Sequence, residues 1–315
     1  MGAWIRTCVL QRIPRVVLGC VLLILPSVLV AQPGELLILY PEVAQPERDV
    51  FTLLRSGIEA AANSAGIKTV AISLPENPSP ADYRTRIRAP TPRAVIALGR
   101  RAYQLTNAMA LEVQVIVGGV DLPVGAAANG ISLTPDPAIV LATLREVAPQ
   151  IQRVIVIADA ERDRWLIEPA SAAARANGLI LQVHSATSIG AAGAHYLNVF
   201  RYGNPRTDAI WILEDGRFIT PDTLPRIIEE SWSRKFLVFS NVLAHVNKGA
   251  LFAYYPDPRA IGERLARLAL ATNGRPQMRF LKDVKRAANV RVGVHLGPAI
   301  NNGQLAQSDL VLGRN

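Results

Sequence analysis

The side chains that most often perform catalysis occur in this 315-residue chain without a known catalytic or metal-binding spacing. GxSxG, HExxH, GxGxxG after a strand and the Walker-type GxxxxGK-S/T are absent, so no hydrolase, zinc protease or phosphate loop is indicated. The histidines are scattered, without the spacing of metal ligands: His184, His195, His245 and His295. We therefore predict no catalytic residue, no metal site and no cofactor.

Glu214 and Asp215 are the carboxylates best placed for acid–base work, because they follow an apolar run that resembles a buried strand. Adjacent residues of an extended chain point to opposite sides, which disfavours a cooperating pair. We therefore expect them to contact a ligand or to form a solvated turn before Gly216. A secreted enzyme that uses one of them as a base is the alternative from another functional class.

Further polar residues and glycines directly follow short apolar runs. Ligands of open α/β sheets bind beyond the carboxyl ends of the strands, so these positions are candidate ligand contacts. Glycines let backbone N–H groups approach a ligand, a helix start after Gly99 suits an anion, and Arg100 can clamp a carboxylate. The predicted ligand-binding residues are Tyr40, Glu42, Gly99, Arg100, Gly119, Asp159, Glu161, Glu214, Asp215, Asn241 and Tyr254.

The elements that position these residues alternate regularly. The apolar runs are mostly continuous, as in strands buried on both faces of a parallel sheet, and helical periodicity lies between them. Helix starts are indicated at Asp136-Pro137, Thr220-Pro221-Asp222 and Asp257-Pro258. The predicted strands are 36–40, 69–74, 94–98, 113–117, 154–158, 179–183, 209–213, 236–240 and 250–254, with further strands around 280–282 and 289–294.

This alternation predicts an α/β fold with doubly wound parallel sheets. The two series of four strands predict two similar lobes, with the boundary near Ala148-Pro149. We expect residues 32–148 to form lobe 1 and 149–251 to form lobe 2, with the tail 252–315 completing lobe 1.

The first 31 residues have the layout of a secretory signal: Arg6, Arg12 and Arg15 precede an apolar run that ends at Ala31. An uncleaved membrane anchor and lipoprotein cleavage at Gly19-Cys20 are the alternatives. Export would place the chain in the periplasm and remove both cysteines. It would reduce the net charge from +9 to +6, with 31 basic and 25 acidic residues remaining.

The net positive charge suggests nucleic acid as a possible partner, and basic residues are concentrated in two stretches, 84–93 and 275–291. The first contains no aromatic residue that could stack on bases, and the second has only Phe280, within a predicted strand. We therefore expect solvated surfaces, no nucleic-acid partner, and contact with a membrane only through a partner protein.

The second half of the chain resembles the ABC transporter substrate-binding family of the tryptophan/tyrosine type. The resemblance begins with a strand that ends in an acidic turn, continues through a helix and a strand that ends in a small residue, and enters the return strand at Lys248-Gly249-Ala250. It extends through a helix with the family's Y-x-x-x-G-x-x-x-A-x-L-A pattern, around Gly262, to a closing segment at 289–297. It is specific from about Pro149 to Gly297.

The resemblance implies a periplasmic-binding-protein type I fold, with two Rossmann-like lobes joined by three crossovers. These would lie near Pro149, Leu251–Tyr254 and Lys282–Lys285. The first strand departs from the family's I-x-Q pattern, because it ends in Tyr40-Pro41-Glu42.

The expected function is that of a periplasmic binding protein, not an enzyme. It would capture an amino acid or related small organic molecule between its lobes and deliver it to an ABC permease. Glu161, Glu214 and Asp215 suit an amino group, and Arg100 or the glycine turns suit a carboxylate. The alternative is presentation of a ligand, or of the protein's own surface, to a membrane-bound sensor.

Overall fold

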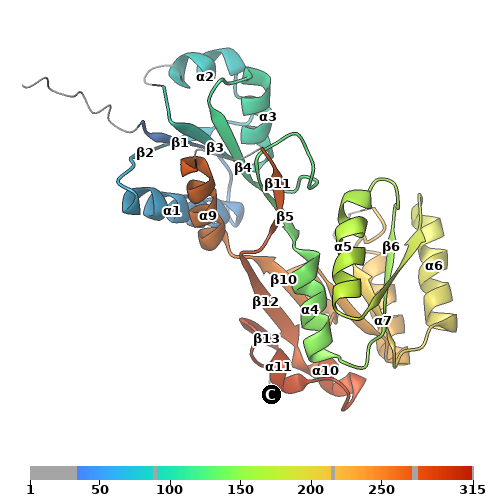
Figure 1. Cartoon of the computed structure of the whole chain (residues 1–315). Helices are drawn as coiled ribbons and strands as arrows, with labels where there is room; N and C mark the ends of the chain where they lie inside the picture. The colour runs from blue at the N-terminus through green and yellow to red at the C-terminus, as the bar shows by residue number, and fades with distance from the viewer. Residues whose placement is uncertain (1–33, 88–90, 214–216, 272–275, 314–315) are drawn as a thin grey trace, which may run out of the picture. The chain divides into compact units, whose positions relative to one another are not determined.

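In the computed structural model, the described residues are 34–87, 91–213, 217–271 and 276–313. The first sheet has the strand order β11-β5-β4-β3-β1-β2, and all its described pairings are parallel (Figure 1). Its strands are β1 (Leu36–Pro41), β2 (Thr69–Leu74), β3 (Ala94–Leu98), β4 (Gln114–Val120), β5 (Gly130–Pro135) and β11 (Met278–Leu281).

The second sheet has the order β13-β12-β10-β9-β8-β6-β7. Its pairings are parallel except between β10 and β12, which run antiparallel. Its strands are β6 (Arg153–Ala158), β7 (Ile180–Ser185), β8 (Asp208–Ile212), β9 (Leu237–Ser240), β10 (Phe252–Pro256), β12 (Val284–Asn289) and β13 (Leu310–Leu312). Both sheets lie within one compact unit, Pro33–Asn315, and the predicted α/β class is confirmed.

Helices cover both faces of each sheet, which explains the continuous apolar strands. The helices are α1 (Glu47–Ser64), α2 (Pro80–Ile87), α3 (Gly99–Met109), α4 (Pro137–Val147), α5 (Arg164–Ala176), α6 (Ile189–Tyr202), α7 (Thr223–Arg234), α8 (Leu243–Lys248), α9 (Pro258–Leu270), α10 (Val290–Leu296) and α11 (Asn302–Leu305). Alternate residues of the first sheet pack on α1 and α9 or on α2 and α3. The second sheet packs on α4 and α5 or on α6 and α7.

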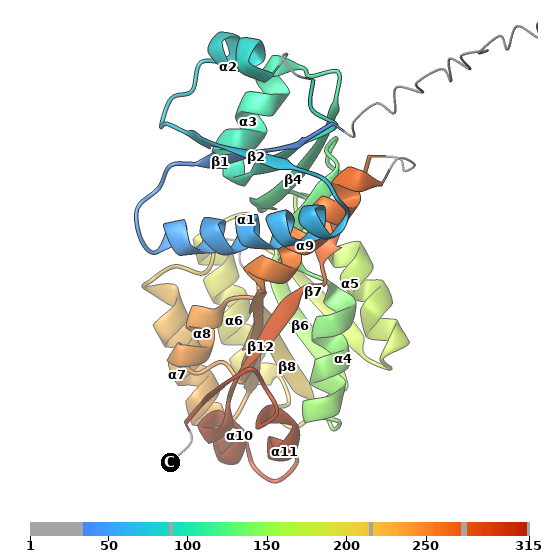
Figure 2. The same cartoon turned by 90° about the vertical axis from the view of Figure 1, so that its left-hand side faces the viewer.

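Helices α1 and α9 lie side by side, although many residues separate them in the sequence (Figure 2). Their approach requires two glycines. A Cβ on Gly57 would lie 2.1 Å from the carbonyl oxygen of Arg259, and one on Gly262 would lie 2.0 Å from that of Leu54. Any larger residue at either position would have to separate the two helices. Gly262 is the glycine of the helix pattern noted in the sequence.

The three crossovers between the sheets correct two predicted boundaries. The chain leaves the first sheet at Pro135–Pro137, because α4 already packs on the second sheet; the boundary predicted at residues 148 and 149 is too late. It leaves the second sheet at Pro256–Pro258, just beyond the predicted 251–254. The third crossover, at Lys282-Asp283, lies within the predicted range.

The tail is divided between the lobes instead of completing lobe 1 as predicted. Of the tail's described elements, only α9 and β11 return to the first sheet, whereas β10, β12 and β13 belong to the second. Most of the predicted strand 289–294 instead belongs to α10, because Asn289 caps this helix by accepting a hydrogen bond from the N–H of Val292 at 3.2 Å. No strand was predicted at β5, β12 or β13.

The predicted signal segment, residues 1–31, lies outside the described residues, so its role stays a prediction. Within the part of the chain that the structure describes, no helix is both long and apolar enough to cross a membrane.

Candidate functional site

Two glycines lie side by side at the carboxyl ends of β3 and β4: Gly99 is the first residue of α3, and Gly119 lies where the register of β4 shifts. Gly99 has a φ of +79° and Gly119 a φ of +66°, a region that side chains other than glycine rarely adopt. A Cβ on Gly119 would lie 3.5 Å from the backbone nitrogen of Gly99, and one on Gly99 would lie 3.1 Å from Cζ of Phe51. The structure therefore brings these two predicted residues together, beside the ring of Phe51.

Helix α3 begins at Gly99 without a side-chain cap and without an acidic residue in its first turn. Its N–H groups and the positive end of its dipole therefore suit an anion. Arg101 binds the carbonyl oxygens of Glu42 at 3.2 Å and Leu74 at 2.9 Å, which fixes the neighbouring turns. Arg100 is exposed, and its guanidinium forms no hydrogen bond or ion pair with a described residue. It is thus available to a ligand.

Tyr40 and Glu42 end the first strand. The ring of Tyr40 is half-buried beneath Arg55 of α1, whose guanidinium carbon lies 4.5 Å from the ring centroid. Glu42 is exposed, and its N–H donates to the carbonyl of Leu74 at 2.8 Å. Of these two residues, only Glu42 has an exposed side chain, whose carboxylate is open to solvent.

In the second lobe, Asp159 belongs to a charged cluster that closes the turn after β6. Arg217 bridges Asp159, at 3.3 Å, and Asp163, at 2.8 Å. Asp159 also accepts from the N–H groups of Arg162 and Glu161, and the Arg162 bond is the main cause that lowers the pKa of Asp159. Its carboxylate is therefore committed to the turn, whereas the exposed Glu161 uses only its backbone there.

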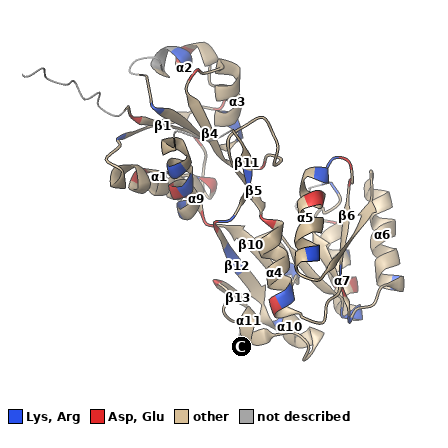
Figure 3. Cartoon of the chain, viewed as in Figure 1, with Lys and Arg blue, Asp and Glu red and all other residues tan. Residues whose placement is uncertain are grey.

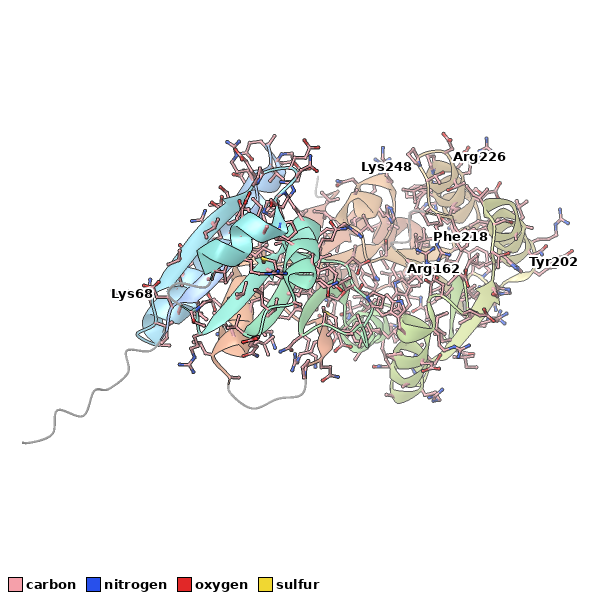
Figure 4. The ribbon with its side chains drawn as sticks, turned by 90° about the horizontal axis from the view of Figure 1, so that it is seen from above. Lys68, Arg162, Tyr202, Phe218, Arg226 and Lys248 are labelled. Atoms are coloured by element: carbon pink, nitrogen blue, oxygen red, sulfur yellow. The ribbon has the colours of Figure 1, made fainter. Side chains whose placement is uncertain are left out.

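Arg217 also lies over the ring of Phe218, with its guanidinium carbon 4.9 Å from the centroid. Phe218 and Arg162, both labelled in Figure 4, thus belong to turns that Arg217 connects across the ends of β8 and β6. The predicted contacts Glu214 and Asp215 lie outside the described residues.

Asn241 and Tyr254 have partners inside the second lobe. Asn241 accepts from the indole N–H of the buried Trp211 at 3.0 Å. The hydroxyls of Tyr254 and Thr143 lie 2.6 Å apart, and both side chains are buried. These contacts support a role in holding the strands and give no support to the predicted ligand contact.

Ser240 and His245 form a buried pair that resembles part of a hydrolase triad, with Oγ 2.7 Å from Nδ1. The hydroxyl donates to the carbonyl of Ile212 at 3.1 Å and accepts from the N–H of Val242 at 3.1 Å. Since Ser240 is fully buried and its proton is bound, the pair fixes the turn after β9 and presents no nucleophile. Burial lowers the pKa of His245.

Sequence reasoning missed three features near these strand ends: the ring of Phe51 on α1, the ion pairs of Arg217, and a hydrogen-bonded cluster around Asp121. Asp121 accepts from the hydroxyl of Ser132 at 3.1 Å and from that of Thr134 at 2.6 Å. The cluster could be found only by recognising β5. Among the residues that the structure describes, no group of three or more His, Cys, Asp or Glu could hold a metal ion.

The crossovers are connected to one another by hydrogen bonds and ion pairs. The N–H of Asp136 donates to the carbonyl of Leu281, and that of Asp257 to the carbonyl of Asp283, each at 2.9 Å. Lys282 lies 3.5 Å from the carboxylate of Asp136, and Lys285 lies 3.1 Å from that of Asp257.

No protein-family model matches the chain. No curated protein matches it in sequence. Solved structures do resemble it. A ligand-free, open structure of a substrate-binding protein with adhesive properties from Clostridium difficile has a TM-score of 0.64 at 14% identity, covering 89% of this chain and 100% of that one.

Two more solved structures have a TM-score of 0.52. An ABC domain in complex with L-Trp from Streptococcus pneumonia is 15% identical, over 89% of this chain and 100% of its own. A conserved domain protein from Vibrio cholerae is 16% identical, over 88% and 99%. Together with the two helix-covered sheets and three crossovers, these likenesses show that the chain has the type I periplasmic-binding-protein fold.

Proposed function

We propose that the chain is a periplasmic solute-binding protein that captures an amino acid or related small organic molecule and delivers it to an ABC importer. The observation that carries the proposal is the pair of positive-φ glycines, Gly99 at the uncapped start of α3 and Gly119 beside it, with the exposed Arg100 next in the chain. This arrangement suits a carboxylate.

The second lobe would bind the other end of the ligand. Glu161 is exposed beside a turn that Arg217 holds rigid, so its carboxylate can pair with an amino group. Glu214 and Asp215 remain proposed partners of the same group. The solved neighbour from Streptococcus pneumonia holds L-Trp, which is a ligand of this class.

The proposal is binding without turnover, and two features of these turns support it. Ser240 is buried with its proton engaged, and Asp159 is held by Arg217, so neither is free to act as a nucleophile or base. A ligand that contacts both lobes would favour the closed state by its differential affinity for that state.

The proposal also includes export to the periplasm, a partner protein at the membrane, and no nucleic-acid partner. Six described cations of the two basic stretches have partners within the protein, whereas Arg291 is exposed: the pairs are Arg84 with Met109, Arg93 with Leu270, Arg279 with Asn129, Lys282 with Asp136, Lys285 with Asp257, and Arg286 with Ser308. Figure 3 shows Lys and Arg interspersed with Asp and Glu.

Isothermal titration of the purified protein against a panel of amino acids and aromatic metabolites tests the proposal. We expect saturable heat from at least one compound, reduced in Arg100→Ala; no heat from any compound would refute it. Adjacent permease and ATPase genes would support delivery to an importer. An adjacent receptor-kinase or cyclase gene would instead indicate a sensor.

A further inference from the structure

A cavity lies at the amino ends of strands of the second sheet. It has a volume of about 780 Å³ and is lined by residues that begin or precede β6, β8 and β9, including Gln152, Thr207 and Leu237. The segment between α10 and α11 forms its other wall. Because the candidate site lies at the carboxyl ends, this amino-end cavity is a separate feature.

The amino-end cavity is lined by Arg206, Arg234 and Lys235, and none of its described lining residues is acidic. Arg234 pairs with Glu230 at 2.8 Å. Arg206 and Lys235 are exposed, and neither forms an ion pair with a described carboxylate. Two cations are therefore free to bind an anionic group.

The rest of the lining is mainly apolar, with Leu237, Leu296 and Ile300 among its residues. The side-chain oxygen of Gln150 is buried without a hydrogen bond and is therefore not exposed to the cavity, so the groups that can bind an anion are the two cations. The cavity thus combines an apolar wall with donors and positive charge.

The walls of the amino-end cavity are held by hydrogen bonds. Arg145 donates to the carbonyls of Pro149, at 2.8 Å, and Ile151, at 3.0 Å, which fixes the turn that carries Gln150. The N–H of Asn301 donates to the carbonyl of Val147 at 2.8 Å, which ties the opposite wall to α4. A ligand would therefore meet a largely preformed site.

We propose that the amino-end cavity binds an amphipathic anion, in which a carboxylate or phosphate head is attached to an apolar chain. Arg206 and Lys235 bind the head, and the wall formed by Leu237, Leu296 and Ile300 packs on the chain. A free fatty acid and an anionic phospholipid share this chemistry. The inference does not depend on the function proposed for the other site.

Titration of the purified protein distinguishes these sources. The probes are dodecanoate below its micelle-forming concentration, soluble dihexanoyl-phosphatidylglycerol, and dodecyl maltoside as a neutral amphiphile. We expect at least one anionic probe to bind at least about tenfold more tightly than the neutral one. The tighter anionic probe identifies the source, whereas equal binding of dodecyl maltoside would overturn the proposal.

Variants locate the binding. Lys235 has a φ of +58°, so Lys235→Gly removes the charge at a position whose backbone suits glycine and preserves the fold. We expect Lys235→Gly and Arg206→Gln each to weaken the anionic probe about three- to tenfold. Arg201→Gln, an exposed arginine outside the cavity lining, should bind like the parent protein. Parent-like binding by both cavity variants would refute the assignment.

A local optical signal provides a second readout. The ring of Trp232 stacks on His295 at a centroid distance of 3.7 Å, and His295 directly precedes Leu296 of the cavity wall. Anionic probes should change the tryptophan fluorescence of the parent protein, and Trp232→Phe should remove that change while titration heat persists. A fluorescence change that persists in Trp232→Phe would place the probe elsewhere.

Discussion

Substitution of Gly119 by alanine separates ligand binding from folding, because the structure tolerates the new methyl group while the proposed site does not. The Cβ would lie 3.4 Å from Leu54, an ordinary contact, and 3.5 Å from the nitrogen of Gly99. A non-glycine residue at a φ of +66° costs about 1–2 kcal/mol of folding stability. The methyl would also cover the N–H of Gly99, and losing one hydrogen bond to a carboxylate costs about 1.5–3 kcal/mol, or roughly 10- to 100-fold in affinity.

The matched control is Gly66→Ala. Gly66 has a φ of +71°, with no atom within 4 Å of a built Cβ, and it follows the C-cap residue of α1, Ala65. Both variants should therefore lose similar stability in urea unfolding, whereas only Gly119→Ala should lose affinity for the amino acid that gives the strongest titration heat with the parent protein. Unchanged affinity in Gly119→Ala, or an equal loss in Gly66→Ala, would refute the placement of the site.

Three further predictions concern stability and are measured by urea unfolding. Burial lowers the folded-state pKa of His245. Its contribution to stability is therefore complete above about pH 6.5 and is lost as the pH falls, because the unfolded state binds the proton more readily. His245→Asn should reduce the decrease in the free energy of unfolding between about pH 7.5 and 5. Asp208→Ala should cost about 3 kcal/mol, because the buried carboxylate pairs with Arg153, and a cost below 1 kcal/mol would contradict this account. Gly262→Ala should lower the free energy of unfolding by about 1–3 kcal/mol, because the new methyl group clashes with α1. Gly193→Ala, with open space around its Cβ, should raise the free energy of unfolding by about 0.5–1 kcal/mol.

The strands β1–β4 and β6–β11 could be predicted from sequence, because parallel strands covered on both faces leave continuous apolar runs. β5, β12 and β13 were missed; in β5 only Ile131 and Leu133 of six residues are strongly apolar, and they alternate with small or polar ones. The first boundary failed for a different reason. Asp136-Pro137 marks where α4 starts, but a helix start contains no information about which sheet the helix will cover.

The candidate site shows a similar division. The glycines at 99 and 119 were predictable, because a glycine after a buried strand often indicates a backbone turn with positive φ. Position at a strand end does not reveal whether a side chain faces a ligand or a neighbouring element. Asn241 reaches Trp211, thirty positions earlier, and Tyr254 reaches Thr143 on α4. Such long-range partners depend on sheet order, which the local pattern does not encode.

The crossovers connect these observations to the proposed mechanism. Two of them end in an Asp-Pro step whose aspartate caps the next helix, at Asp136 and Asp257. Proline fixes its own φ and restrains the residue before it to extended backbone, so little rotation is available at these steps. Each aspartate also pairs with a lysine of the third crossover region, Lys282 or Lys285. Because the three connections restrain one another, few backbone dihedral angles are free to change when one lobe rotates relative to the other. In the proposed mechanism, a ligand would therefore choose between a small number of lobe arrangements by its differential affinity for them.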